Sequence, residues 1–185
     1  MKKTTSGFTI VELLIVIVTI GVIASIAIVA YNGIQTRAQN TRLLSAFDTY
    51  EKALRQYKAL NGNYPAYTPP GSELYACLGT SFPATADFAL DKCYVYNGTN
   101  YATKSTQVNT ALLTVLSGLP DTSSYVLHLS SGGDTYHLRG IHYLSGGLSA
   151  SLMYYIQGNQ TCGRGTPTPM TIGSTTFTMC SLDII

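Results

Sequence analysis

The hydrophobic positions of this chain are concentrated in one uninterrupted run near its start. Residues 8–31 read FTIVELLIVIVTIGVIASIAIVAY and contain a single charged residue, Glu12. As a helix this run would be roughly 36 Å long, at about 1.5 Å per residue, whereas the hydrocarbon core of a bilayer is about 30 Å thick. The pattern therefore predicts a helix over residues 8–31 that is long enough to cross a membrane.

The residues before this run set its predicted orientation. Residues 1–7, MKKTTSG, include Lys2 and Lys3 and no acidic residue. Basic residues beside an apolar helix favour the cytoplasmic side, so we expect everything after Tyr31 to lie outside the membrane. A cleaved secretory signal also begins with basic residues, but its apolar stretch is about 7 to 15 residues, which is shorter than this run.

Glu12 is the exceptional residue of the apolar run. An ionised carboxylate at membrane depth costs at least about 2.5 kcal/mol on insertion scales, so it needs a partner. A cut between Gly7 and Phe8 would create an α-amino group one helical turn away, and such an amine is largely protonated at neutral pH. It could pair with Glu12 of the same chain or of a neighbouring chain. Pairing between chains would make Glu12 an assembly residue.

These residues match a known family. The segment Gly7-Phe8-Thr9-Ile10-Val11-Glu12-Leu13-Leu14, after a basic leader and before a long apolar helix, resembles the class III signal of type IV prepilins and pseudopilins. The resemblance covers about thirty residues. It implies that a prepilin peptidase cuts after Gly7 and methylates Phe8, and that Glu12 registers each subunit against its neighbour's N-terminus. Many members have a proline near the end of the apolar helix, whereas the first proline here is Pro65, so no proline kink is expected.

A helical period continues beyond the apolar run, through residues 32–60. Five apolar residues recur at steps of 4, 3, 4 and 3, which places them on one helix face: Leu43, Phe47, Tyr50, Leu54 and Tyr57. Asn61-Gly62, followed by Pro65, predicts the end of the helix. Asn32-Gly33 is an alternative stop, but the period resumes at once. We therefore expect one continuous helix whose second half is amphipathic and packs on a globular head.

Residues 61–185 are predicted to form that head. A short helix is expected at 106–117. Three segments rich in strand-forming residues and separated by glycine turns then predict an antiparallel meander, at 125–130, 135–144 and 148–157. A last hairpin is expected from 170–172 and 176–180, with its turn at Gly173-Ser174. Residues 158–169 are expected to form an exposed loop. The predicted class is α+β, with a long N-terminal helix packed on a small antiparallel, pilin-like sheet.

Four cysteines, Cys77, Cys93, Cys162 and Cys180, allow three complete disulfide pairings. Local pairing, Cys77 with Cys93 and Cys162 with Cys180, closes loops of ordinary size, and thiols outside the membrane should oxidise. A zinc site of four thiolates is the alternative, but no CxxC pair is present and zinc ligands are typically closer in sequence. Disulfides are therefore favoured. The cysteine-bounded loop near the C-terminus is similar to one found in many pilins.

Composition narrows the function classes. Only 11% of the residues are charged, with a net charge of +2, against about 25% charged in ordinary domains. This disfavours a strongly basic nucleic-acid binder, and DNA contacts through Arg37, Arg42, Arg55 and Lys58 have only weak support. His128, His137 and His142 lie in predicted strands, but their spacing is no recognised ligand pattern. No metal site, cofactor or catalytic motif is predicted, and the chain is not expected to be an enzyme.

We therefore predict a structural subunit of a type IV pilus. Its parts would be a cleaved leader at 1–7, a transmembrane and filament-core helix at 8–31, an amphipathic continuation at 32–60 and an extracytoplasmic head at 61–185. Its expected partners are copies of itself in a helical homopolymer, prepilin peptidase, the pilus assembly platform and minor pilins. It would sit in the cytoplasmic membrane as a single-pass protein with the head outside before joining a cell-surface filament for adhesion, motility or DNA uptake. The alternatives are a pseudopilin of a type II secretion or competence machine, a minor tip pilin acting as an adhesin, and a permanent anchor that keeps residues 1–7.

Overall fold

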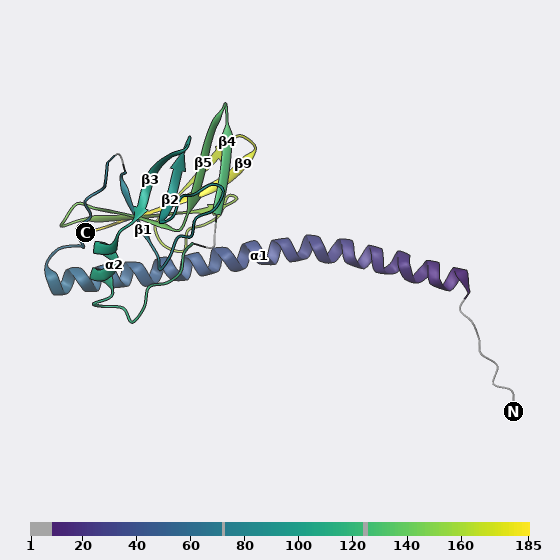
Figure 1. Ribbon diagram of the computed structural model, residues 1–185. Coiled ribbons are helices and arrows are strands. Elements are labelled where there is room, and N and C mark those ends of the chain that lie inside the picture. The colour runs from purple at the N-terminus through teal and green to yellow at the C-terminus, as the bar shows by residue number, and fades with distance from the viewer. Residues whose placement is uncertain (1–8, 72, 124–125) are drawn as a thin grey trace. The chain divides into compact units, whose positions relative to one another are not determined.

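The computed structural model describes residues 9–71, 73–123 and 126–185. By its internal contacts the chain divides into two units, Met1–Ala38 and Gln39–Ile185. The elements comprise one long helix, one short helix and a mixed sheet (Figure 1). The α+β class expected from the sequence is confirmed.

The long helix, α1, runs from Ile10–Asn61 without a break. The alternative stop at Asn32-Gly33 is therefore not used. The helix ends where the sequence predicts, because Gly62 adopts a φ of +82° and its N–H donates to the Lys58 carbonyl at 2.7 Å. A left-handed glycine just past the last turn is the commonest way to satisfy terminal helix carbonyls.

In the first unit, the described side chains from residue 9 to residue 35 are all exposed. Ile10 is 85% exposed, Ile23 67% and Ile34 66%, so no face of this segment is covered within the chain. By length and composition the helix is able to cross a membrane. Its apolar surface is therefore available to lipid or to other apolar helices.

In the second unit, the last part of α1 buries the face that the sequence predicts. Leu43, Phe47, Tyr50 and Leu54 are at most 3% exposed, and Tyr57 is half-buried. They pack with residues of the sheet, and the Phe47 ring lies 4.6 Å from the Tyr154 ring. Period-3.6 spacing of large apolar residues thus fixes which side of the helix carries the head.

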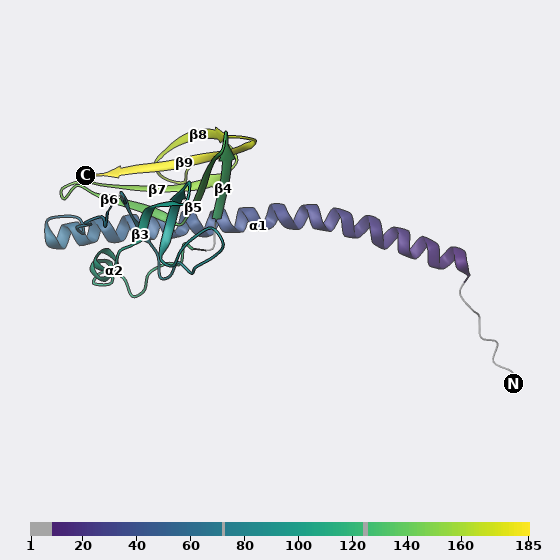
Figure 2. The same ribbon diagram turned by 45° about the horizontal axis from the view of Figure 1, so that its top comes forward.

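Within the described residues the sheet has nine strands, ordered β4-β5-β2-β3-β1-β6-β7-β9-β8. Their bounds are β1 Tyr75–Leu78, β2 Lys92–Tyr96, β3 Thr99–Lys104, β4 Val126–Ser131, β5 Asp134–Arg139, β6 Ile141–Ser145, β7 Ala150–Gln157, β8 Thr166–Ile172 and β9 Thr175–Ile184. All neighbouring pairs are antiparallel except β1 and β3, which are parallel. β4 and β5 run steeply across the direction of β7 and β9, so the sheet is strongly twisted (Figure 2).

The single strand expected at 135–144 is wrong, because the structure divides it into β5 and β6 at Gly140. Gly140 has a φ of +73°, and a Cβ atom there would come within 2.9 Å of the Phe82 ring. The two halves also pair with different strands: β5 lies between β4 and β2, whereas β6 lies between β1 and β7. The expected meander is thus interrupted by three strands from earlier in the chain.

Two further boundaries differ from the sequence prediction. The short helix, α2, covers only Thr106–Leu112, because the next amides bond three residues back, Thr114 N–H to the Ala111 carbonyl and Val115 N–H to the Leu112 carbonyl. The expected loop at 158–169 is partly strand, since β8 begins at Thr166 and includes Pro167 and Pro169. Proline is tolerated there because β8 is an edge strand.

Candidate functional site

The described part of α1 begins with a reciprocal cap made by Thr9 and Glu12. The Thr9 amide and hydroxyl both donate to Glu12 Oε2 at 2.8 Å, and the Glu12 amide donates to Thr9 Oγ1 at 3.3 Å. This is a capping box, which satisfies amides that the first helical turn leaves free. The predicted cleavage and methylation residues, Gly7 and Phe8, lie outside the described residues.

Glu12 is the only charged residue of the sequence between residues 9 and 36. Its carboxylate is exposed, as are the apolar side chains around it. The capping box uses Oε2, so Oε1 remains available to a cation on another chain without breaking the box. One acidic group on an otherwise apolar helix surface is the principal chemical feature of this unit.

The head contains two disulfides, Cys77 to Cys93 and Cys162 to Cys180. Each cysteine is thus bonded to its neighbour in the sequence, which is the pairing that the sequence analysis favoured among the three possible ones. Cys77, Cys93 and Cys180 are fully buried, whereas Cys162 is half-buried. The first bridge fastens β1 to β2 inside the core, and the second fastens the segment before β8 to β9.

A buried carboxylate links the same C-terminal segment to α1. Glu51 is 1% exposed, and its Oε1 accepts a hydrogen bond from Arg55 Nε at 2.9 Å. Arg164 Nε, two residues after Cys162, lies 2.8 Å from Oε2. Sequence reasoning did not single out Glu51, although its position between Phe47 and Leu54 on the buried face was a signal for an acid in the core.

The three histidines separate into two environments. His142 is fully buried on β6, and burial lowers the pKa of its imidazole to about 4, although its Nε2 lies 3.2 Å from the Arg139 carbonyl oxygen. His128 and His137 instead meet at the surface, with their Nδ1 atoms 2.8 Å apart. Asp87 joins them, although nothing in the spacing of the histidines along the sequence pointed to this acid.

Two of the basic residues of α1, Arg55 and Lys58, are engaged in contacts within the described head. Arg55 is paired with Glu51, and Lys58 Nζ donates to the Leu148 carbonyl at 2.9 Å while lying over the Tyr64 ring. These contacts give both residues structural roles. The geometry therefore adds no support to DNA binding along this helix.

Similarity to known proteins agrees with this architecture. The chain is 32% identical over 71 residues to the type IV major pilin protein PilE1 of Neisseria gonorrhoeae, covering 38% of this chain and 33% of the relative. It is 36% identical over 64 residues to the type II secretion system core protein G of Aeromonas hydrophila, covering 35% and 45%. It is 35% identical over 66 residues to the fimbrial protein EcpC of Eikenella corrodens, covering 36% and 43%.

The chain thus spans between a third and less than half of the length of these three relatives. No family model matches it, and no solved structure matches it. The relatives nevertheless confirm the resemblance to type IV pilins and pseudopilins, and they support a pilin-type subunit. The long apolar helix joined to an α+β head agrees with that class.

Proposed function

We propose that this chain is a structural subunit of a type IV pilus filament. In this proposal residues 1–7 are removed after Gly7, and Phe8 becomes the methylated N-terminus. The apolar helix then holds the subunit in the cytoplasmic membrane, with the head outside, until assembly transfers it into a surface filament. Prepilin peptidase, an assembly platform, minor pilins and further copies of the chain are the proposed partners.

The observation that supports this proposal is the uncovered apolar surface of the first unit. Every described side chain from residue 9 to residue 35 is exposed, and Glu12 is the only charge among them. A contiguous apolar surface of this extent is not stable in water and requires lipid or a protein partner. A bundle of identical apolar helices supplies such cover after the subunit leaves the bilayer.

The Thr9–Glu12 pair suggests how Glu12 acts in this assembly. Within one chain the capping box occupies Oε2, and Glu12 keeps a negative charge on the first helical turn. In a filament, the methylated, protonated amine of a neighbour's Phe8 would contact this carboxylate in an apolar, low-dielectric environment, where the attraction is strong. An offset in axial position would leave both charges unpaired, so the pair would select a single register.

A pseudopilin of a type II secretion machine is the second candidate. It is favoured by the similarity to type II secretion system core protein G from several bacteria, including 35% identity over 82 residues of the Escherichia coli protein. Both candidates use the same helix and the same processing. They differ in the product, since a pilus subunit would dominate long surface filaments and a pseudopilin would be confined to a short fibre.

The proposal is tested by replacing Glu12. We expect Glu12→Ala to insert into the membrane as well as wild type, because the substitution removes a charge from an apolar helix. Filament assembly should fall at least about tenfold, since the loss of a charge-assisted contact worth about 1.5 to 3 kcal/mol acts at every subunit interface. The measurement is the amount of subunit in sheared surface filaments relative to the membrane fraction.

Thr9→Ala is the matched control. It removes the hydroxyl of the capping box but leaves the Glu12 carboxylate and its charge, at a cost of about 1 kcal/mol to the helix start. We expect this variant to assemble near the wild-type level. Normal filament yield from Glu12→Ala, or equal loss from both variants, would contradict the register role of Glu12.

A further inference from the structure

The β4–β5 hairpin places two histidines side by side on the head surface. In the antiparallel register of these strands, His128 lies directly opposite His137. Their rings meet edge to face, with centroids 5.0 Å apart and an interplanar angle of 72°. Their Nδ1 atoms lie 2.8 Å apart and share a hydrogen bond, in which one ring donates and the other accepts. Directly opposed strand residues lie close enough for such contact, so the hairpin itself sets this geometry.

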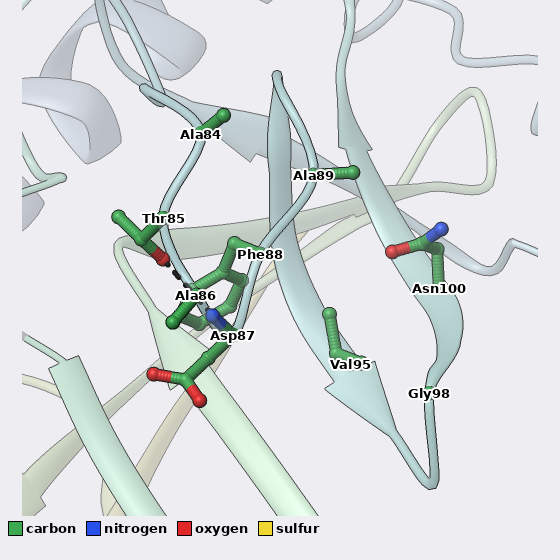
Figure 3. Close-up of a pocket in the computed structure, with 9 residues that line it drawn as sticks. All are labelled: Ala84, Thr85, Ala86, Asp87, Phe88, Ala89, Val95, Gly98 and Asn100. Atoms are coloured by element: carbon green, nitrogen blue, oxygen red, sulfur yellow. Dashed lines mark hydrogen bonds between the residues drawn. The ribbon is translucent and has the colours of Figure 1, made fainter.

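A carboxylate from a distant loop completes a triad. Asp87 Oδ2 lies 3.7 Å from His128 Nδ1, and Asp87 Oδ1 lies 3.9 Å from His137 Nδ1. One ligand atom from each of the three residues lies within 4.8 Å of the other two. Figure 3 shows the loop from the side of a surface cavity, where the Asp87 carboxylate points away from Val95 and Asn100.

The loop that carries Asp87 is held in place by the core. The Thr85 amide donates to the Phe88 carbonyl at 2.9 Å, and the Asp87 amide lies 3.3 Å from Thr85 Oγ1. The Phe88 side chain is 2% exposed and packs against the Arg139 guanidinium, whose carbon lies 4.2 Å from the ring centroid. The Phe88 ring also meets the His137 ring edge to face, with the ring centroids 6.1 Å apart. Asp87 is therefore positioned by its neighbours and does not depend on a ligand to approach the histidines.

We propose that Asp87, His128 and His137 form a binding site for a divalent transition metal of the zinc type. Zinc bonds of about 2.0 to 2.1 Å in a tetrahedron separate ligand atoms by about 3.3 Å. The Nδ1–Nδ1 separation, 2.8 Å, is shorter than this value, whereas the two distances from Asp87, 3.7 and 3.9 Å, start from different carboxylate oxygens and are longer. A metal ion would replace the hydrogen bond between the two rings, and rotation of the three side chains would bring both Nδ1 atoms and one carboxylate oxygen to tetrahedral separations.

The chemistry of the ligands selects the class of metal. Two imidazoles and one carboxylate suit Zn²⁺, Ni²⁺ and Cu²⁺, whereas Mg²⁺ and Ca²⁺ prefer oxygen ligands throughout. The side chains of His128, Asp87 and His137 are 52%, 38% and 20% exposed, so a metal ion can reach the site from solvent. A fourth coordination position remains open to water or to an external ligand.

Metal binding is tested on the full chain in detergent micelles, purified without a histidine tag. Isothermal titration calorimetry with Zn²⁺ alone should give saturable binding of one ion per chain. We expect His128→Gln, His137→Gln and Asp87→Asn each to weaken this binding at least about tenfold. In ¹⁵N spectra of the wild-type protein, Zn²⁺ should shift the Nδ1 resonances of both surface histidines and leave those of His142 unchanged.

Asp134→Asn is the matched control. It removes one negative charge from the same hairpin, and the new side chain retains an oxygen that can accept the hydrogen bond from Asn97 Nδ2, now 2.7 Å long. We expect its Zn²⁺ affinity to equal that of wild type. Absence of saturable binding, equal binding by the three triad variants, or unmoved Nδ1 resonances would overturn the proposal. None of these measurements depends on filament assembly, so their outcome is independent of the proposed function.

Discussion

His142 and Glu51 are ionisable side chains buried in the core of the head, and each avoids an isolated buried charge in a different way. His142 stacks on the rings of Tyr75 and Tyr94 and meets the Tyr155 ring edge to face, and burial lowers its pKa so that it stays neutral at neutral pH. Glu51 keeps two arginines as partners, and the side chains of these arginines are about half exposed. A neutral base and a paired acid are the two ways in which a core accommodates titratable groups without an isolated charge.

The first residue-scale prediction concerns pH. Burial lowers the pKa of His142 to about 4 in the folded head, whereas an unfolded histidine titrates near 6.5. Between these values the unfolded chain binds a proton that the folded chain does not, so stability is lost as pH falls from about 6.5 toward 4. The contribution of this residue is up to about 3 kcal/mol. Urea unfolding followed by tyrosine fluorescence at several pH values measures it.

His142→Phe removes this titrating group and should flatten the pH dependence over that range. The explanation fails if wild type and His142→Phe lose equal stability between pH 6.5 and pH 4.

The second residue-scale prediction concerns Glu51. Glu51→Ala removes the acceptor for Arg55 and the ion pair to Arg164, and it leaves a small cavity in the core. Because both arginines remain partly solvated, we expect a loss of about 1 to 3 kcal/mol, below the 3 to 5 kcal/mol typical of a fully buried pair. Lys52→Ala, on the exposed face of the same helix, should change stability by at most about 0.5 kcal/mol. Equal urea midpoints for the two variants would refute this role.

At the scale of elements, the sheet brings β8 near β4 through a tight turn. Gly173, between β8 and β9, has a φ of +61°, and a Cβ atom there would overlap the Ser130 carbonyl oxygen of β4. Apolar side chains from both ends of the sheet, including Leu129, Met170 and Phe177, line a small cavity of about 100 Å³. The turn therefore has to be a glycine for a packing reason as well as a conformational one.

Alanine substitutions distinguish the packing requirement at Gly173 from its need for a left-handed backbone conformation. Gly173→Ala introduces a left-handed alanine and a clash with backbone, whereas Gly147→Ala introduces only the left-handed alanine, since nothing lies within 4 Å of its Cβ position and its φ is +83°. We expect Gly173→Ala to be more destabilising by about 1 to 3 kcal/mol, the usual cost of overpacking. Thermal unfolding of the two variants gives the comparison, and equal losses would show that the β8–β9 turn does not contact β4.

Local patterns explain which elements could be predicted from the sequence. The period of α1 and its glycine stop depend on residues within a few positions of one another, and the structure confirms both. β1, β2 and β3 were not predicted. β2 and β3 form a hairpin through the Asn97-Gly98 turn, a local signal that the sequence prediction overlooked. β1, in contrast, pairs with β3 and β6, which lie far along the chain. Asp87 was missed as a neighbour of His128 and His137 for the same reason, since only the folded sheet brings the 84–89 loop to the β4–β5 hairpin.

At the scale of the whole molecule, the chain combines one unit whose apolar side chains are exposed with a second unit whose large apolar side chains are mostly buried. The head buries its large apolar residues around α1 and the sheet, and it is stabilised by two disulfides. The first unit exposes its apolar residues along the helix and has one acid near its start. A protein of this kind is stable alone only while lipid covers the helix, and we propose that copies of the same helix replace lipid in the filament.

Mass spectrometry of sheared surface filaments, with sequencing of the subunit N-terminus, tests this account most directly. The account predicts that the main filament subunit is this chain, that it begins at Phe8 with a methyl group on its amine, and that Glu12 follows four residues later. A native chain that retains Met1 and is found only in the membrane fraction would contradict it.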